Sequence, residues 1–391
     1  MQGFFRKACL AIGISMVVQA GPAFAKEDKF AIGGLLALSG PLGILGGDAR
    51  KGMDLAIEER GGKLLGVPID MQWEDTESKP QVAVQKATRV LSKGVKFVVG
   101  SVGSGETLAI MKVTAGRQVP LLVPLSTDPS ITGENRNEFT FRTAPSGDSF
   151  TPLVIEYIKT AKPKKVYGVA SDYGVSKAGW NQVKAALGKD VQVVGEDFPA
   201  LGAQDFSVIV NKIANSGAEL VYVGTGGSDS VAFLKQASEI KLKSKVTMIG
   251  PNLVDSTLAK AVGDGALGIL SATRYDFSLD NAPNKAFVER YRKKYNEYPS
   301  QLAGEAYDGL KWWLDTVDAT GSWDSAVWMK AFRTSKWQTS IVGQREMRAC
   351  DNQSQNPGFI GEVVKGVAPQ PDYTMKVIAS FKAEAVATKC P

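Results

Sequence analysis

The chain has 391 residues, of which 44% are apolar and 22% are charged, and its formal net charge is +6. This length accommodates two domains, and the composition is that of a globular protein, which excludes a fibrous or disordered chain. The chain contains no histidine, which excludes Ser-His-Asp and Cys-His nucleophilic sites and histidine-ligated metals, and the mild positive charge gives no indication of nucleic-acid binding.

The first segment is typical of a secretory signal peptide. Arg6 and Lys7 precede an apolar stretch at residues 8–20, and an Ala-x-Ala pattern ends at Ala25. A charged start, an apolar centre and small residues at the cleavage point are the three parts of such a signal. A membrane anchor is the alternative, but this stretch is too short to span a bilayer. We therefore expect residues 1–25 to be removed and the mature protein to be soluble and periplasmic.

Short β-rich apolar runs alternate with helical patterns along the rest of the chain. One helical pattern covers residues 206–213, with Asp205 as its expected N-cap and Gly217 just beyond its end. This alternation predicts parallel sheets with helices on both faces. The expected strands cover residues 30–36, 67–73, 97–99, 121–123, 165–170, 191–195, 220–223, 246–249 and 268–272.

Two pairs of similar segments indicate that the chain contains two similar α/β units. "FVVGSVGS" at 97–104 and "VYVGTGGS" at 221–228 both join an apolar strand to a turn of glycine and hydroxyl residues. Each is followed by an apolar strand and a proline turn, at 121–129 and at 246–254. Ligands of open α/β sheets bind outside the carboxyl ends of the strands. Two such lobes would therefore present both sets of turns to one cleft.

The first of these turns combines features that suit an anion. The N-terminus of a helix offers unpaired N–H groups and a partial positive charge, and Ser104 and Thr107 add hydroxyl donors. Residues 125–128 supply further hydroxyl and backbone groups. Simple capping of helices by serine and threonine is the alternative. The glycine-rich residues 40–52 lack the ending of a phosphate-binding loop, and we expect no cofactor and no metal site.

The cysteines indicate a disulfide in the mature protein. Of the three cysteines, Cys9 lies in the signal segment, which leaves Cys350 and Cys390. In an oxidising compartment these two are expected to form a disulfide that holds the C-terminal tail.

Five segments, in order and at consistent spacing, resemble a known family. They are "ALSGPLGILGGDARKGMDLAIEERGG" (37–62), "LGVPIDMQWEDTESKPQVAVQKATRVLSKGVKFVVGS" (65–101), "VPLLVPLSTDPSIT" (119–132), "QDFSVIVNKIANSGAELVYVG" (204–224) and "MIGPN" (248–252). Over nearly its whole length the mature chain is similar to the periplasmic substrate-binding proteins of branched-chain amino acid ABC transporters.

The resemblance implies a type I periplasmic binding protein fold, an α/β architecture of two similar, doubly wound lobes with parallel sheets. Three crossovers would join the lobes as a hinge, near residues 144–148, 272–277 and 350–357. The N-terminal lobe would contain residues 26–146 and 275–352, and the C-terminal lobe residues 147–274 and 353–391.

The resemblance also implies ligand-binding residues on the N-terminal lobe. Ser104 and Thr127 match hydroxyl donors to a ligand carboxylate. Leu125 matches the position whose backbone carbonyl accepts from a ligand ammonium. Leu45 and Leu302 fall where side chains flank the ligand.

On the opposite lobe, Tyr173 matches a tyrosine of the family, whereas two positions depart from its amino-acid binders. Asn252 replaces a glutamate that pairs with the ligand ammonium, and Gly226 replaces a tyrosine. Enclosing an ammonium without a carboxylate leaves a largely desolvated charge, at a cost of several kcal/mol. Either the ligand has no ammonium, or another acid takes over, for which the candidates are Glu106, Asp172, Asp229 and Asp255.

We therefore expect the solute-binding component of an ABC importer, with no reaction of its own. Its partners would be a small-molecule ligand and membrane permease subunits, with no nucleic acid, and it would act as a monomer. A branched-chain or other neutral amino acid is the first expected ligand, and an ammonium-free organic acid such as an aromatic carboxylate is the second. A ligand-sensing receptor domain and an enzyme are the alternatives from other classes.

Overall fold

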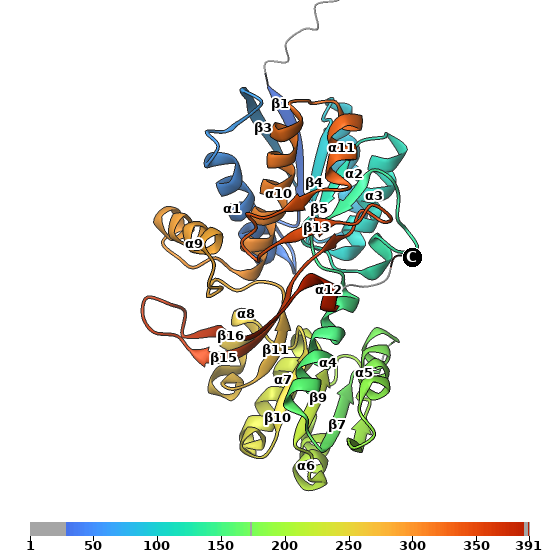
Figure 1. Ribbon diagram of the computed structural model, residues 1–391, viewed down its shortest axis with the longest axis vertical. Helices are drawn as coiled ribbons and strands as arrows, with labels where there is room; N and C mark the ends of the chain where they lie inside the picture. Colours follow the sequence, from blue (N-terminus) through green and yellow to red (C-terminus); the bar gives the residue numbers. More distant parts are fainter. Residues whose placement is uncertain (1–28, 173, 387–389, 391) are drawn as a thin grey trace, which may run out of the picture.

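The computed structural model describes residues 29–172, 174–386 and 390. Two α/β lobes lie one above the other, and the chain passes between them more than once (Figure 1). The expected signal peptide at residues 1–25 lies outside the described residues. Within the described part of the chain, no helix has both the length and the apolar character needed to cross a membrane.

The first lobe is built on a six-stranded sheet with the order β2-β3-β1-β4-β5-β6. Its strands are parallel except for β2, which pairs antiparallel with β3. The strands are β1 (Phe30–Leu36), β2 (Lys63–Leu64), β3 (Val67–Asp75), β4 (Phe97–Gly100), β5 (Leu121–Val123) and β6 (Thr140–Arg142).

Helices cover both faces of this sheet because successive strand residues point to opposite sides. Phe97 and Val99 of β4 belong to the core under α1 (Gly43–Glu58), α10 (Gln301–Thr320) and α11 (Ser325–Phe332). Val98 lies in a separate core under α2 (Pro80–Ser92) and α3 (Ser104–Gly116). The sheet is therefore buried on both sides, as parallel sheets normally are.

The second lobe is built on a seven-stranded sheet with the order β16-β15-β11-β10-β9-β7-β8. Five strands are parallel, and β15 and β16 add an antiparallel edge. The strands are β7 (Lys165–Ala170), β8 (Gln192–Asp197), β9 (Leu220–Gly224), β10 (Thr247–Pro251), β11 (Leu270–Thr273), β15 (Gly358–Lys365) and β16 (Tyr373–Phe381).

The helices of the second lobe also lie on both faces of its sheet. Side chains of α4 (Phe150–Ala161) and α5 (Gly174–Ala186) pack in one core. Those of α6 (Ser207–Ser216), α7 (Gly227–Glu239) and α8 (Ser256–Val262) pack in the other. Outside the two sheets lie α9 (Ala282–Tyr295), α12 (Ala383–Val386) and a small antiparallel sheet of β12 (Lys336–Trp337), β13 (Arg345–Met347) and β14 (Ser354–Gln355).

The strands and the fold class expected from the sequence are confirmed. Each expected strand is present, with ends that move by at most two residues. The expected N-cap of the helix near residue 206 is wrong by one residue, because the helix starts at Ser207 and Phe206 is the N-cap. Asp205 instead accepts a hydrogen bond from the Ser207 N–H at 2.9 Å. Gly217 ends this helix in the left-handed conformation, as expected.

The chain runs between the two lobes from β6 to α4, from β11 to α9 and from β13 to β15. The first and third of these connections lie side by side. Gln353 Nε2 donates to the Ala144 carbonyl at 2.8 Å, and Ser354 Oγ donates to the Thr143 carbonyl at 2.9 Å. The lobe boundaries expected from the sequence stay a prediction.

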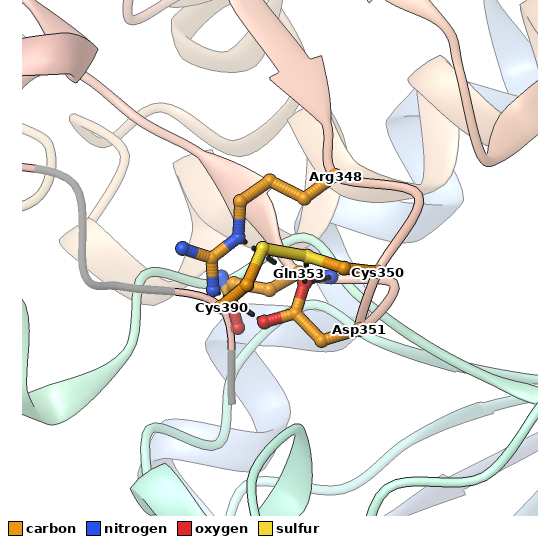
Figure 2. Close-up of a disulfide and its surroundings, with 5 residues drawn as sticks. All are labelled: Arg348, Cys350, Asp351, Gln353 and Cys390. Carbon is orange, nitrogen blue, oxygen red and sulfur yellow. Dashed lines mark hydrogen bonds and ion pairs between the residues drawn. A yellow bond between two sulfur atoms is a disulfide. The ribbon is translucent and has the colours of Figure 1, made fainter.

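A disulfide joins Cys350 to Cys390, with the two Cα atoms 6.3 Å apart, which confirms the expected pair. Figure 2 shows it beside Asp351, whose carboxylate accepts from Arg348 Nε at 3.1 Å and from the Gln353 N–H at 3.2 Å. The disulfide therefore ties the C-terminal end of the chain to the third connection between the lobes.

Candidate functional site

The expected ligand-binding residues of the first lobe lie along one edge of its sheet. Because β1, β4 and β5 are parallel, their carboxyl ends meet at that edge. Leu45 follows β1, Ser104 follows β4, and Leu125 and Thr127 follow β5. The chain leaves β1 toward one side of the sheet and β4 toward the other, so this is the switch point where open α/β sheets bind ligands.

Buried hydroxyl groups hold the turns after β4 and β5 together. Ser126 Oγ donates to the Ser101 carbonyl at 2.8 Å and lies 2.6 Å from Thr107 Oγ1. The Ser101 N–H donates to Thr107 Oγ1 at 3.2 Å. All three residues are buried. Thr107, which the sequence suggested as a donor to a ligand, is therefore a part of the framework instead.

Ser104 is the first residue of α3 and is half-buried at the end of β4. The carboxylate of Glu106 caps this helix: its Oε2 accepts from the Gly103 N–H at 3.1 Å, and its Oε1 accepts from the Thr76 hydroxyl. The bonds of Ser126 to Thr107 and Ser101 tie the start of α3 to the turn that carries the half-buried Thr127. Leu302, on the first turn of α10, is half-buried on the opposite face of the sheet, against the core under α1, α10 and α11.

The turns of the second lobe also share one edge, after β7, β9, β10 and β11. Tyr173 lies outside the described residues. Gly226 is exposed at the N-cap of α7, and no atom of the described residues comes within 4 Å of the position of a Cβ there. Asn252 is exposed with a φ of 49°, a left-handed conformation that asparagine tolerates well.

Arg274, directly after β11, joins the edges of the two lobes. Its Nη1 donates to the Leu125 carbonyl at 3.1 Å, and its side chain is only 7% exposed. Its Nη2 lies 3.2 Å from Glu305 Oε2 on α10. In the amide orientation that satisfies both groups, the Gln301 oxygen accepts from Nε and Nη2, each at 3.0 Å. Sequence reasoning missed this residue.

The four acids that could replace the missing glutamate all have other partners. Glu106 caps α3, as described above. Asp229 is buried and accepts from the Gly202 N–H at 2.9 Å. Asp255 is the N-cap of α8 and accepts from the Leu258 N–H at 2.8 Å. Asp172 forms an ion pair with Lys177. Glu106, Asp229 and Asp255 therefore serve the fold, whereas Asp172 lies in an exposed ion pair.

A buried charged cluster lies behind Arg274, where the lobes connect. Asp308 Oδ2 and Arg345 Nη1 form an ion pair at 2.6 Å, and Arg345 also donates to the Thr143 carbonyl. Burial raises the pKa of Glu305 to about 7, although the charges of Arg274 and Arg345 oppose this shift. The cavity that these groups line holds about 10 Å³, room for roughly one water.

A larger cavity of about 450 Å³ lies between residues 128–134 of the first lobe and Val175 of the second. Its lining also includes Asp148 and Arg348 near the connections between the lobes. It adjoins Thr127 through Asp128, but its lining contains none of the residues expected to bind the ligand. Their role in binding stays a prediction.

Comparison with known proteins gives consistent matches over nearly the whole chain. A family model described as periplasmic binding protein matches residues 29–368. Leu/Ile/Val-binding protein homolog 3 of Brucella melitensis biotype 1 is 26% identical over 339 residues, which cover 85% of this chain and 91% of that protein.

Solved structures show the same fold. The amino acid ABC transporter substrate-binding protein from Pseudomonas fluorescens Pf-5 matches with a TM-score of 0.80 and 25% identity, covering 93% of this chain and 99% of that one. A solute binding protein of an ABC transporter from Rhodopseudomonas palustris BisB5, in complex with 3,4-dihydroxy benzoic acid, matches with a TM-score of 0.78 and 24% identity, covering 93% and 99%.

Proposed function

The chain belongs to the family of periplasmic binding proteins, and we propose that it is the periplasmic solute-binding component of an ABC importer. It binds a small carboxylate between its two lobes and delivers it, chemically unchanged, to membrane permease subunits. It works as a monomer and needs no cofactor. The family and fold support this proposal, because the relatives above are substrate-binding proteins.

The observation that carries the proposal is the arrangement at the switch point of the first lobe. Ser104 opens α3, a helix of 13 residues, and Thr127 lies on the neighbouring turn. Buried bonds between Ser126, Ser101 and Thr107 fix these two turns to each other. Hydroxyl donors at a helix N-terminus match the needs of a carboxylate. A carboxylate is therefore the group that this edge suits best.

Binding in this arrangement proceeds by closure of the lobes. The ligand docks on Ser104 and Thr127 first, and the edge that carries Gly226 and Asn252 then covers it. Contacts from both lobes stabilise the closed form, so the ligand shifts the population toward closure.

Two classes of ligand agree with this proposal, neutral amino acids and aromatic acids. The Brucella relative is named as a Leu/Ile/Val-binding protein homolog, which agrees with a neutral amino acid. The exposed Gly226, with open space at its Cβ position, agrees with a larger ring such as that of an aromatic acid.

Calorimetry after a thermal-shift screen of amino acids and organic acids tests the proposal. We expect Ser104→Ala to weaken the binding of the best carboxylate about tenfold, since it removes a hydrogen bond to a charged group. Ser325→Ala is the matched control. Ser325 is also half-buried at the first position of a helix, α11. It follows the C-terminal end of α10, whereas the candidate site adjoins the N-terminal end of that helix. Unchanged affinity in Ser104→Ala would contradict the proposed site.

A further inference from the structure

We propose that Arg274 makes this site selective for carboxylates that lack an α-ammonium group. The inference rests on the proposed function and names the class of its ligand. It starts from one contact: the guanidinium of Arg274 donates to the carbonyl of Leu125 across the two lobes, at 3.1 Å. The carbonyl that the resemblance assigns to a ligand ammonium thus already accepts from a cation of the protein.

An amino acid whose carboxylate lies on Ser104 and Thr127 needs acceptors for its ammonium within a few ångströms. Three backbone carbonyls on the turns of this edge already have donors. The Ser101 carbonyl accepts from Ser126 Oγ at 2.8 Å, and the Thr127 carbonyl accepts from the Gly147 N–H at 2.7 Å. The Leu125 carbonyl accepts from Arg274. An ammonium here would have only the second lone pairs of these oxygens as acceptors, with a donor of the fold already beside each.

The four acids considered above as replacements for the glutamate already have other partners. Glu106, Asp229 and Asp255 are held by the structural contacts described above, and Asp172 pairs with Lys177 at the surface. Glu305 is buried against Arg274, and the cavity in front of it has room for roughly one water. Its carboxyl therefore faces Arg274 and is not open to a ligand.

Arg274 is held in place firmly enough to impose this selectivity. The Gln301 oxygen on α10 accepts from its Nε and Nη2, and Glu305 on the same helix lies beside Nη2. The Leu125 carbonyl accepts from its Nη1. Its planar group also lies over the ring of Phe150, 6.0 Å from the centroid. Glu305 balances this positive charge only in part, because burial raises the pKa of its carboxyl to about 7. The remaining positive charge repels an ammonium and attracts an anion. The same residue thus favours an acid and disfavours its amino derivative.

Pairs of ligands that differ only in the ammonium give the direct test on the wild-type protein. We would titrate 4-methylpentanoate against leucine, and 3-phenylpropanoate against phenylalanine, by calorimetry at pH 7. In any pair of which at least one member binds, we expect the member without the ammonium to bind at least about tenfold more tightly. Equal or tighter binding of the amino acids would overturn the inference and leave the proposed function intact. Absence of binding by all four, and by benzoate and 4-hydroxybenzoate, would overturn the proposed function and the inference with it.

The Arg274→Met variant tests whether the selectivity depends on this residue. Removing the guanidinium frees the Leu125 carbonyl, so we expect the preference for the acid within a pair to fall at least about fivefold. A general loss of packing or closure would weaken both members alike and leave the ratio unchanged, and an unchanged ratio overturns the assignment.

Arg333→Met is the matched control for this variant. Arg333 Nη2 also donates to a backbone carbonyl, that of Glu138, at 2.6 Å, but away from both strand edges. We expect its ligand ratio to equal that of the wild type. If Arg274→Met fails to fold, the wild-type pairs still decide the inference.

Discussion

At the residue scale, Glu305 lies between the candidate site and the region where the lobes meet. It is buried on α10, 3.2 Å from Arg274, and burial raises its pKa from an ordinary 4.5 to about 7. The folded protein therefore keeps a proton on Glu305 in a pH range where the unfolded chain has lost it. The stability contributed by this proton is present below pH 4.5 and is lost as the pH rises through about 7.

We predict that Glu305→Gln removes this part of the pH dependence. Between pH 5 and pH 8 the wild type should lose about 2 to 3 kcal/mol of unfolding free energy relative to the variant. Urea unfolding of both proteins at several pH values measures the difference. Asp276, whose pKa burial raises to about 6, is present in both proteins and cancels. Parallel curves for the two proteins would show that Glu305 is already ionised throughout this range.

The residues of the site differ in how far the sequence could predict them. Ser104, Leu125 and Thr127 follow apolar strands in short turns, so a local pattern and a resemblance were enough to place them on one edge. Arg274 also follows an apolar strand, but its partner Leu125 is 149 residues away. A contact of that kind depends on how the two lobes meet, which no local pattern contains.

At the element scale, the packing of α1 against α10 positions Leu45 and Leu302, the two leucines that are expected to flank the ligand. Gly52 of α1 lies so close to α10 that a Cβ there would be 2.0 Å from the Ala303 carbonyl oxygen. We predict that Gly52→Ala lowers the unfolding free energy by about 2 kcal/mol or more, because the two helices must move apart.

Gly47→Ala on the same helix is the control for this substitution. No atom of the described residues lies within 4 Å of a Cβ at Gly47, so alanine should stabilise the helix by about 0.5 to 1 kcal/mol. Chemical denaturation of both variants measures the contrast. Similar effects in the two variants would mean that α1 and α10 tolerate a wider spacing.

The disulfide stabilises the connection between the C-terminal end and the third crossover. It closes a loop with a sequence separation of 40 residues. We predict that replacing Cys350 and Cys390 by serine together lowers the unfolding free energy by about 2 to 4 kcal/mol. Urea unfolding without reductant measures the loss, and the wild type in reductant should match the variant. An unchanged midpoint would show that the tail is held by other contacts.

Strands and helices of the two sheets could be predicted because each carries its own periodic pattern. The antiparallel β15–β16 edge and the small β12–β14 sheet were not expected from the sequence. Their pairing joins segments whose apolar residues are interrupted by glycine and charged residues, as in β15. The N-cap near Asp205 was misplaced by one residue because its carboxylate bonds to an N–H two positions on.

At the scale of the whole molecule, the two lobes are joined where neighbouring connections bond to each other. Gln353 and Ser354 of the third connection donate to the carbonyls of Ala144 and Thr143 in the first. Such bonds agree with the proposed closure, in which the lobes rotate about connections that stay together. The resemblance implied this arrangement, whereas the buried cluster behind Arg274 came only from the structure.

The measurement that tests the central claim most directly is small-angle X-ray scattering with and without a saturating carboxylate. The probe is the tightest binder among 4-methylpentanoate, 3-phenylpropanoate, benzoate and 4-hydroxybenzoate. If the lobes close on the ligand, the radius of gyration falls on saturation, and Ser104→Ala requires more ligand for the same change. Saturation by calorimetry with no change in the scattering curve would contradict the claim that the two lobes enclose the ligand.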